Sequence, residues 1–136
     1  MSLLSIKAAL EVRLKAISSP LATAWENSPF DAPSGKPYQA VHFMPTPPEN
    51  PTMGDSFRRE RGIMQVTLYY PQSGGAGTAV SKAVALQEWF PRGSTYVANG
   101  ITTTIERTPE IGGGRIVGDR FAVPVSIRYY ANILAP

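Results

Sequence analysis

The sequence predicts an α+β fold: a single domain, residues 1–136, in which a mostly antiparallel β-sheet or small sandwich is flanked by two helices and joined by long Pro/Gly-rich loops. Three observations lead to this prediction. Apolar and polar residues alternate within Ile63 to Tyr70, which is the period of a strand. Apolar residues recur every three or four positions over the first 17 residues, which is the period of a helix. The 13 prolines and 12 glycines require long irregular connections.

Length and composition exclude several classes of protein. A chain of 136 residues can bury one hydrophobic core. It has no cysteine, which excludes disulfide bonds, thiolate nucleophiles and thiolate metal sites. No apolar run reaches the ~18 to 20 residues that cross a bilayer, and the N-terminus lacks the order of a signal peptide. We therefore expect a soluble protein that is made and used inside a cell.

The first predicted helix has Ser2 as its N-cap and ends before Ser18-Ser19-Pro20, because a residue that precedes proline is forced out of helical geometry. Its apolar stripe consists of Leu3, Ile6, Leu10, Leu14 and Ile17. A short strand is expected at Ala22 to Glu26, with Trp25 as a core or interface anchor. A Pro-rich loop, Asn27 to Pro37, then leads to a second strand.

The second strand is predicted over Tyr38 to Met44. It contains His42, the only histidine of the chain. With no cysteine and no nearby pair of carboxylates, His42 cannot form a metal site or a catalytic triad with its sequence neighbours. We interpret it as a strand histidine that is bonded to a neighbour.

A long loop is predicted from Pro45 to Glu60, because this segment has four prolines and no periodicity. Loops longer than about 12 to 15 residues in compact domains are usually functional or disordered. The loop ends in a cluster of arginines, Arg58, Arg59 and Arg61. Guanidinium groups can form bidentate pairs across a subunit boundary, and the same cluster is equally consistent with a solvated turn.

The central strand, Ile63 to Tyr70, has the strongest strand pattern in the chain. Alternation places its apolar residues Met64, Val66, Leu68 and Tyr70 on one face. The other face, Ile63, Gln65, Thr67 and Tyr69, is mixed and suits water, a helix edge or a neighbouring subunit. Pro71 should end the strand, because proline has no amide hydrogen to donate.

After a Gly-rich connection (Gln72 to Gly77), a second helix is predicted from a Thr78 cap through Phe90. One side of this helix is expected to carry Val80, Ala83, Val84, Gln87 and Phe90, with Leu86 and Trp89 towards a second side. Asn99-Gly100 is the signature of a type I′ turn, so Ser94 to Ala98 should pair with Ile101 to Arg107 as a hairpin. Pro109 to Asp119 contains three consecutive glycines and is predicted to be a mobile loop.

The last strand alternates from Phe121 to Tyr129, and its other face carries Arg120 and Arg128. Pro124 predicts an edge position or a bulge. An edge strand with arginines on its open face could extend a sheet across a symmetric subunit interface.

Several separate phrases, in one order along nearly the whole chain, resemble the small tail-terminator (tail completion) proteins of long-tailed bacteriophages. They are SLLSIKAALEVRL, TAWENSPF, PENPTMGDSFRRERGIMQVTLYYP, WFPRGSTY and RTPEIGGGRIVGDRFAVPVSIRYYA. The resemblance implies a small α+β domain whose copies form a hexameric ring at the head-proximal end of the tail tube. Such a ring ends tube growth and offers a surface to the head-joining proteins.

The partners that this resemblance implies are other copies of the chain, the tail tube protein and the head–tail joining proteins, with DNA only as cargo that passes through the ring. It implies a virion protein of the tail that is assembled in the bacterial cytoplasm. It implies no membrane, metal or cofactor and no catalytic residue. The candidate interface residues are Phe57, Arg58, Arg59, Arg61, Arg120 and Arg128.

Two alternatives remain open from the sequence. The chain could be a head–tail connector or a tube-like subunit, which would present the same residues to different partners. It could also be a weak nucleic-acid-binding module that uses the arginine cluster with Tyr69 and Tyr70, in which case its affinity would fall steeply with salt. An enzyme is not expected, because no nucleophile and base occur at a recognisable spacing.

Overall fold

The computed structural model describes residues 2–18, 20–54, 57–72 and 77–134. Its elements, in chain order, are α1 (Ser2–Lys15), β1 (Ala22–Ala24), β2 (Tyr38–Glu49), β3 (Phe57–Pro71), α2 (Gly77–Trp89), β4 (Thr95–Ala98), β5 (Ile101–Ile105), β6 (Glu110–Ile111), β7 (Arg115–Val117) and β8 (Arg120–Leu134). In the part of the chain described, neither helix is long and apolar enough to span a membrane. The α+β prediction is confirmed.

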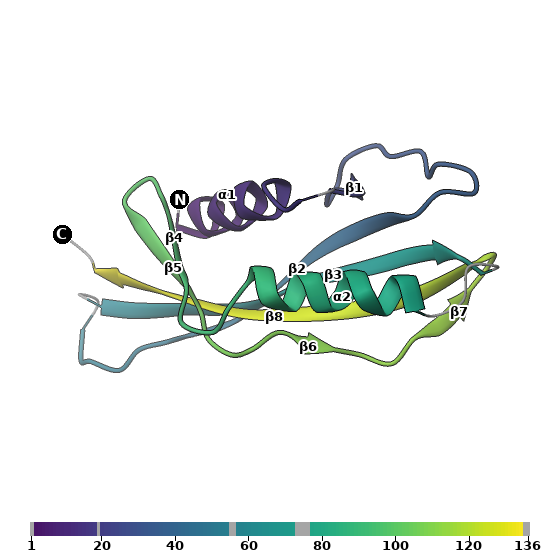
Figure 1. The fold of residues 1–136 in the computed structure, drawn as a ribbon. Coiled ribbons are helices and arrows are strands. Elements are labelled where there is room, and N and C mark those ends of the chain that lie inside the picture. Colours follow the sequence, from purple (N-terminus) through teal and green to yellow (C-terminus); the bar gives the residue numbers. More distant parts are fainter. Residues whose placement is uncertain (1, 19, 55–56, 73–76, 135–136) are drawn as a thin grey trace.

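The sheet is built around β3 and β8, which pair antiparallel along their full length (Figure 1). The strand order is β1-β2-β3-β8-β5-β4, and β6 and β7 also pair with β8. All pairs are antiparallel except β1 with β2. The sheet is therefore mostly antiparallel, as predicted.

One face of the sheet forms the core, and the alternation of β3 fixes which face that is. Met64, Val66, Leu68 and Tyr70 are buried, as predicted, and they pair with core residues of β8 such as Val125 opposite Val66. Residues of both helices belong to the same cluster. The core therefore lies between the sheet and the two helices.

The helix α1 buries the stripe that its spacing predicts. Ile6, Leu10 and Leu14 are fully buried and Ile17 follows them just beyond the helix, whereas Leu3 is 40% exposed. The helix ends at Lys15, before Pro20, as expected. The predicted Ser2 cap depends on a side chain that lies outside the described residues.

The helix α2 is present but is rotated relative to the prediction. Its buried stripe is Ala79, Ala83, Leu86 and, just after the helix, Phe90. Val80 and Val84, which were expected on this side, are 44% and 39% exposed. The spacing 79, 83, 86, 90 is also helical, and small alanines let α2 approach the sheet closely, which a prediction based on bulky residues misses. Thr78 lies inside the helix and is not its cap.

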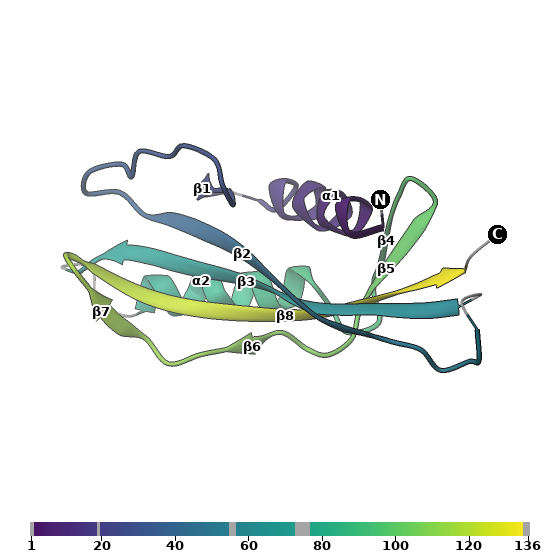
Figure 2. The same ribbon diagram turned by 180° about the vertical axis from the view of Figure 1, so that it is seen from behind.

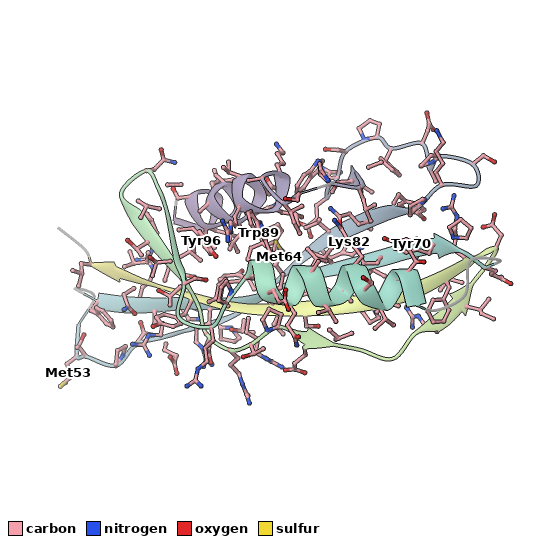
Figure 3. All side chains as sticks on the ribbon, in the orientation of Figure 1. Met53, Met64, Tyr70, Lys82, Trp89 and Tyr96 are labelled. Atoms are coloured by element: carbon pink, nitrogen blue, oxygen red, sulfur yellow. The ribbon has the colours of Figure 1, made fainter. Side chains whose placement is uncertain are left out.

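The ends of the two helices are joined through Arg13 and Trp89. The Arg13 guanidinium lies 3.6 Å from the centre of the Trp89 ring, and its Nε and Nη2 donate to the Trp89 carbonyl at 3.2 and 2.8 Å. In return, the indole Nε1 of Trp89 donates to the Arg13 carbonyl at 2.7 Å. Figure 3 shows Trp89 and Tyr96 between the helices and the hairpin.

The prediction of a loop from Pro45 to Glu60 is wrong for most of these residues. β2 continues to Glu49 and β3 starts at Phe57, so the arginine cluster lies in a strand. The prolines are tolerated because β1 covers β2 only at residues 38–40, and beyond that point β2 is an edge strand. The remaining turn carries Met53, which is almost fully exposed at the tip of the hairpin (Figure 3).

The prediction that the last strand lies at an edge is also wrong. β8 has β3 on one side and β5, β6 and β7 in succession on the other, so it cannot extend the sheet to a neighbour along most of its length. Pro124 fits there because it lies opposite the gap between β6 and β7, where its carbonyl accepts a hydrogen bond from the Gly112 amide at 2.8 Å. The segment 109–119 is accordingly not a free excursion, since β6 and β7 run along β8.

The predicted hairpin is confirmed as β4 and β5. Its turn residues Asn99 and Gly100 have φ of 52° and 76°, as a type I′ turn requires. The short strand predicted at Ala22 to Glu26 is present as β1, and the loop expected before β2 is present. Residues 73–76 of the predicted Gly-rich connection lie outside the described residues.

Candidate assembly surface

The face of the sheet opposite the core carries no helix in the part of the chain that the structure describes (Figure 2). We call this surface the open face. Its side chains come from alternate residues of β2, β3 and β8, namely His42, Met44, Phe57, Arg59, Arg61, Ile63, Gln65, Ser126, Arg128, Tyr130, Asn132 and Leu134. The mixed face that alternation predicts for Ile63 to Tyr69 is part of it.

Arg61 is at the centre of the charged part of the open face. Its Nη2 lies 2.9 Å from Glu106 Oε2 and its Nη1 lies 3.4 Å from Glu49 Oε2. The hydrogen bond and charge of Glu106, followed by the charge of Glu49, hold the pKa of Arg61 above its ordinary value. This one guanidinium connects the end of β2 to the residue that follows β5.

Arg59 and Arg128 extend the charged cluster on either side. Arg59 Nε donates to Asn132 Oδ1 at 2.9 Å, and its guanidinium lies 5.1 Å from the Tyr130 ring centre. Its Nη1 is 3.7 Å from Glu49. Arg128 Nε is 3.3 Å from Glu110. The three arginines and their three glutamate partners balance in charge.

The ion pairs of the open face are solvated and individually weak. The side chains of Arg59, Arg61 and Arg128 are 37% to 40% exposed. Exposed ion pairs contribute about 0 to 1 kcal/mol each. Such pairs can be exchanged for new partners at small cost, and a balanced set of charges does not repel another copy of the same surface.

The hollows on the open face are shallow and polar. One of about 230 Å³ is lined by Arg61, Ile63, Glu106 and Arg128 among others. A neighbouring one of about 270 Å³ is lined by Glu49, Arg59, Arg61, Glu106 and Tyr130. Small-molecule sites are mostly apolar and enclosed. Neither hollow has the form of such a site.

The described residues include no group of three or more His, Asp or Glu side chains that could hold a metal ion. His42, the only histidine, is exposed on the open face in β2. Its neighbours on adjacent strands include Gln65, which lies opposite it in β3.

The structure brings only some of the predicted interface residues together. Arg59, Arg61 and Arg128 share the open face, and Phe57 lies on the same face at the start of β3, opposite Leu134. Arg58 points to the other face, where its Nε contacts Glu60 Oε1 at 2.8 Å. The role of these residues in an interface stays a prediction.

Arg120 has a different environment from the one predicted. It is only 7% exposed, and its guanidinium donates to the carbonyls of Pro33 and Lys36. It also lies 5.0 Å from the Tyr38 ring centre, and Tyr38 stacks on Tyr69 at 4.8 Å. Arg120 thus fastens the loop before β2 to the sheet, and its guanidinium is not offered to solvent.

Sequence reasoning missed Glu49, Glu106, Glu110 and Tyr130 as members of this surface. Tyr130 could have been found, because the alternation that contains Arg128 continues through it. The glutamates gave no signal. Glu49 was assigned to a loop, and the partners Arg61 and Glu106 are 45 residues apart in the chain.

A solved structure superposes with a TM-score of 0.81 at 27% sequence identity, covering 100% of this chain and 99% of that chain. Its name does not describe a function, and it is one of five solved chains that match. None of the curated proteins compared with the chain matches it.

A family model described as "Phage tail terminator protein" matches residues 5–129. The match runs from the first turns of α1 to the middle of β8. It includes every core residue except Ala131, and all of the charged residues of the open face. The chain therefore belongs to the phage tail terminator protein family.

Proposed function

We propose that copies of this chain form a hexameric ring that caps the head-proximal end of the phage tail tube, ends tube polymerisation and provides the surface to which the head is joined. The observation that carries the proposal is the family match over residues 5–129. The family is one of structural tail proteins, which makes the chain a component of the virion. It acts by binding, and its partners are other copies of itself, the tube protein and the head-joining proteins.

The open face supports this role. It is the one broad surface of the sheet without a helix over it in the described residues, and it combines exchangeable ion pairs with exposed apolar side chains. Leu134 and Met44 are 74% and 41% exposed there. Interfaces that form from soluble subunits have such mixed composition. We place the contact to a neighbouring subunit or to the tube on this face.

The proposal is tested by growing tubes from the purified tube protein of the same phage, with and without this chain, and by imaging both ends. A ring at one end and a tube length that falls as the chain is added are expected. Tubes of unchanged length, with the folded chain left unbound, would contradict the proposal. The mass of the free chain, measured over a range of concentrations, shows whether the ring forms before it meets the tube.

The salt dependence of DNA affinity distinguishes the nucleic-acid-binding alternative from the proposed function. Proteins that neutralise several phosphates lose about 10³ to 10⁵ in affinity between 50 and 200 mM salt. The arginines of the open face are already paired with glutamates, and Tyr69 stacks on Tyr38, so the open face presents little uncompensated positive charge. We expect weak binding to DNA at low salt and none at physiological salt.

A further inference from the structure

The outer edge of β2 is free along most of its length. β3 pairs with the inner edge of β2, and β1 pairs with its outer edge only at residues 38–40, so no described strand lies along the outer edge from Val41 to Glu49. A free edge presents unpaired backbone amides and carbonyls, and it can pair with a strand of another chain.

Only one outward amide exists between His42 and Pro48. The Phe43 amide donates to a carboxylate outside the β2–β3 ladder, which shows that this amide points away from β3. Neighbouring residues of a strand direct their amides to opposite sides, so His42, Met44 and Thr46 face β3, where they pair with Gln65, Ile63 and Arg61. The other three residues of the segment, Pro45, Pro47 and Pro48, have no amide hydrogen.

The Glu26 carboxylate accepts a hydrogen bond from that one outward amide. Its Oε2 accepts from the Phe43 amide at 2.8 Å, and its Oε1 lies 3.0 Å from Lys7 Nζ on α1. Asn27, with φ of 54°, turns the chain away just after β1, so Glu26 projects along the edge that β1 no longer covers. Burial opposes ionisation of Glu26, but the Phe43 amide and Lys7 outweigh it and lower the pKa of the carboxyl.

The edge from His42 to Pro48 lacks a row of free donors. Its prolines have no amide hydrogen, and Glu26 holds the Phe43 amide. A groove of about 470 Å³ lies beside the start of this edge and is lined by Trp25, Glu26, Val41 and His42 among others.

We propose that Glu26 takes the place of a neighbouring strand's carbonyl and, together with Pro45, closes the β2 edge against the β2 edge of a second copy. Without Glu26 and Pro45, the β2 edges of two copies would pair antiparallel about a twofold axis, with backbone hydrogen bonds at residues 43 and 45. Closing the edge prevents sheet-to-sheet dimers and leaves other surfaces, such as the open face, for assembly. This proposal does not depend on the terminator role.

The test compares the purified wild-type chain with the double variant Glu26→Ala/Pro45→Thr, which frees one outward amide and restores a second. We expect the double variant to associate at a protein concentration at least about tenfold lower than wild type, as judged by sedimentation, since each new hydrogen bond contributes to the dimer. Amide exchange should show new protection at residues 43 and 45 on association. The control Glu11→Ala/Pro51→Thr makes the same residue changes at positions away from the edge and should behave as wild type.

Two further variants separate the hydrogen bond from the ion pair. Glu26→Gln keeps an oxygen that can accept from Phe43, and Lys7→Met keeps the Glu26 carboxylate, so both combined with Pro45→Thr should need a higher protein concentration to associate than Glu26→Ala/Pro45→Thr. If these two combinations associate as readily as Glu26→Ala/Pro45→Thr, the hydrogen bond is not the closing element and the proposal is wrong. A folded Glu26→Ala/Pro45→Thr variant that keeps the mass and exchange pattern of wild type also overturns it.

Should the double variant not fold, the single variant Glu26→Ala decides the matter through the Phe43 amide itself. Loss of a hydrogen bond to a charged acceptor should speed exchange of this amide by about tenfold or more, while the Met44 amide, which faces β3, keeps its rate. Unchanged protection of Phe43 would show that Glu26 does not hold the edge. Neither outcome bears on tube capping, which is measured separately.

Discussion

At the level of single residues, Gly62 leaves room for the side chain of Tyr129 between the two long strands. The two residues are opposite each other in β3 and β8. A Cβ added to Gly62 would lie 2.3 Å from the Tyr129 hydroxyl oxygen and 2.7 Å from Cζ. The glycine is therefore required by the tyrosine ring that crosses it and not by its own backbone angles.

We predict that Gly62→Ala lowers the free energy of unfolding by about 1 to 3 kcal/mol, because the ring of Tyr129 must move within a filled core. Urea denaturation measures the change. Gly113→Ala is the matched control, since an added Cβ there meets nothing within 4 Å, and it should alter stability by less than about 0.5 kcal/mol. Equal stability of Gly62→Ala and wild type would show that the ring is not held in this position.

The hydroxyl of Tyr129 gives a second prediction at this scale. Tyr129 is 1% exposed, and its hydroxyl has no hydrogen-bond partner among the described residues. Burial, with the nearby charges of Glu60 and Glu26, raises the pKa of Tyr129 to about 12. In the unfolded chain the hydroxyl loses its proton near pH ~10. The folded state therefore binds more protons than the unfolded state between these two values.

The contribution of Tyr129 to the free energy of unfolding is therefore fully present below pH ~10. It is lost as the pH rises through about 12, and the free energy of unfolding then falls by at most about 1.4 kcal/mol per pH unit. Tyr129→Phe should flatten this decline and leave stability at pH 7 equal or higher. Burial also raises the pKa of Tyr70, so part of the slope remains. An identical decline in wild type and Tyr129→Phe, followed by denaturation at several alkaline pH values, would contradict this account.

At the level of elements, α1 and α2 depend on the reciprocal contact between Arg13 and Trp89. Lysine can keep the charge at position 13 but cannot both stack flat on the indole and donate twice to the Trp89 carbonyl. We predict that Arg13→Lys lowers the free energy of unfolding by about 1 to 2 kcal/mol. Arg92→Lys, at an exposed position after α2, should change it by less than about 0.5 kcal/mol. Equal effects of the two substitutions, measured by urea denaturation, would mean that the contact does not join the helices.

Local signals predicted the elements whose structure depends on neighbours in sequence. The stripe from Ile6 to Leu14, the faces of β3 and the Asn99-Gly100 turn are examples. The same reasoning failed where pairing with a distant strand decides the structure. Prolines were interpreted as loop residues in β2 and as an edge signal in β8. Pro45 and Pro47 instead lie on the outer edge of β2, and Pro124 lies opposite the gap between β6 and β7.

At the level of the whole molecule, the fold class and one face of the sheet could be predicted, but the composition of the open face could not. Alternation places Arg59 and Arg61 on one side of β3, but it does not show that Glu49 and Glu106 meet them there. Arg120 was expected on the surface, and its contacts to Pro33 and Lys36 lie 87 and 84 residues away in the chain. A single sequence carries no signal for pairs so distant.

Tail length in the phage most directly tests the proposal that this chain limits tail length through its open face. A phage lacking the gene is complemented with the variant Arg59→Ser/Arg61→Ser/Arg128→Ser. The control is Lys15→Ser/Lys36→Ser/Arg92→Ser, which removes the same charge at exposed positions on α1, in the loop before β2 and after α2. Both variants should fold with nearly wild-type melting temperatures, since exposed ion pairs contribute little.

We predict tails of uncontrolled length, or tails without heads, for the open-face variant, and normal tails for the control. In the open-face variant, three glutamates lose their arginine partners. Breaking a desolvated charge pair at an interface costs about 2 to 5 kcal/mol, and a ring repeats this loss at every contact. Electron microscopy of the particles gives the length distribution. Tails of normal length that join heads in normal yield, made by a folded open-face variant, would contradict the claim.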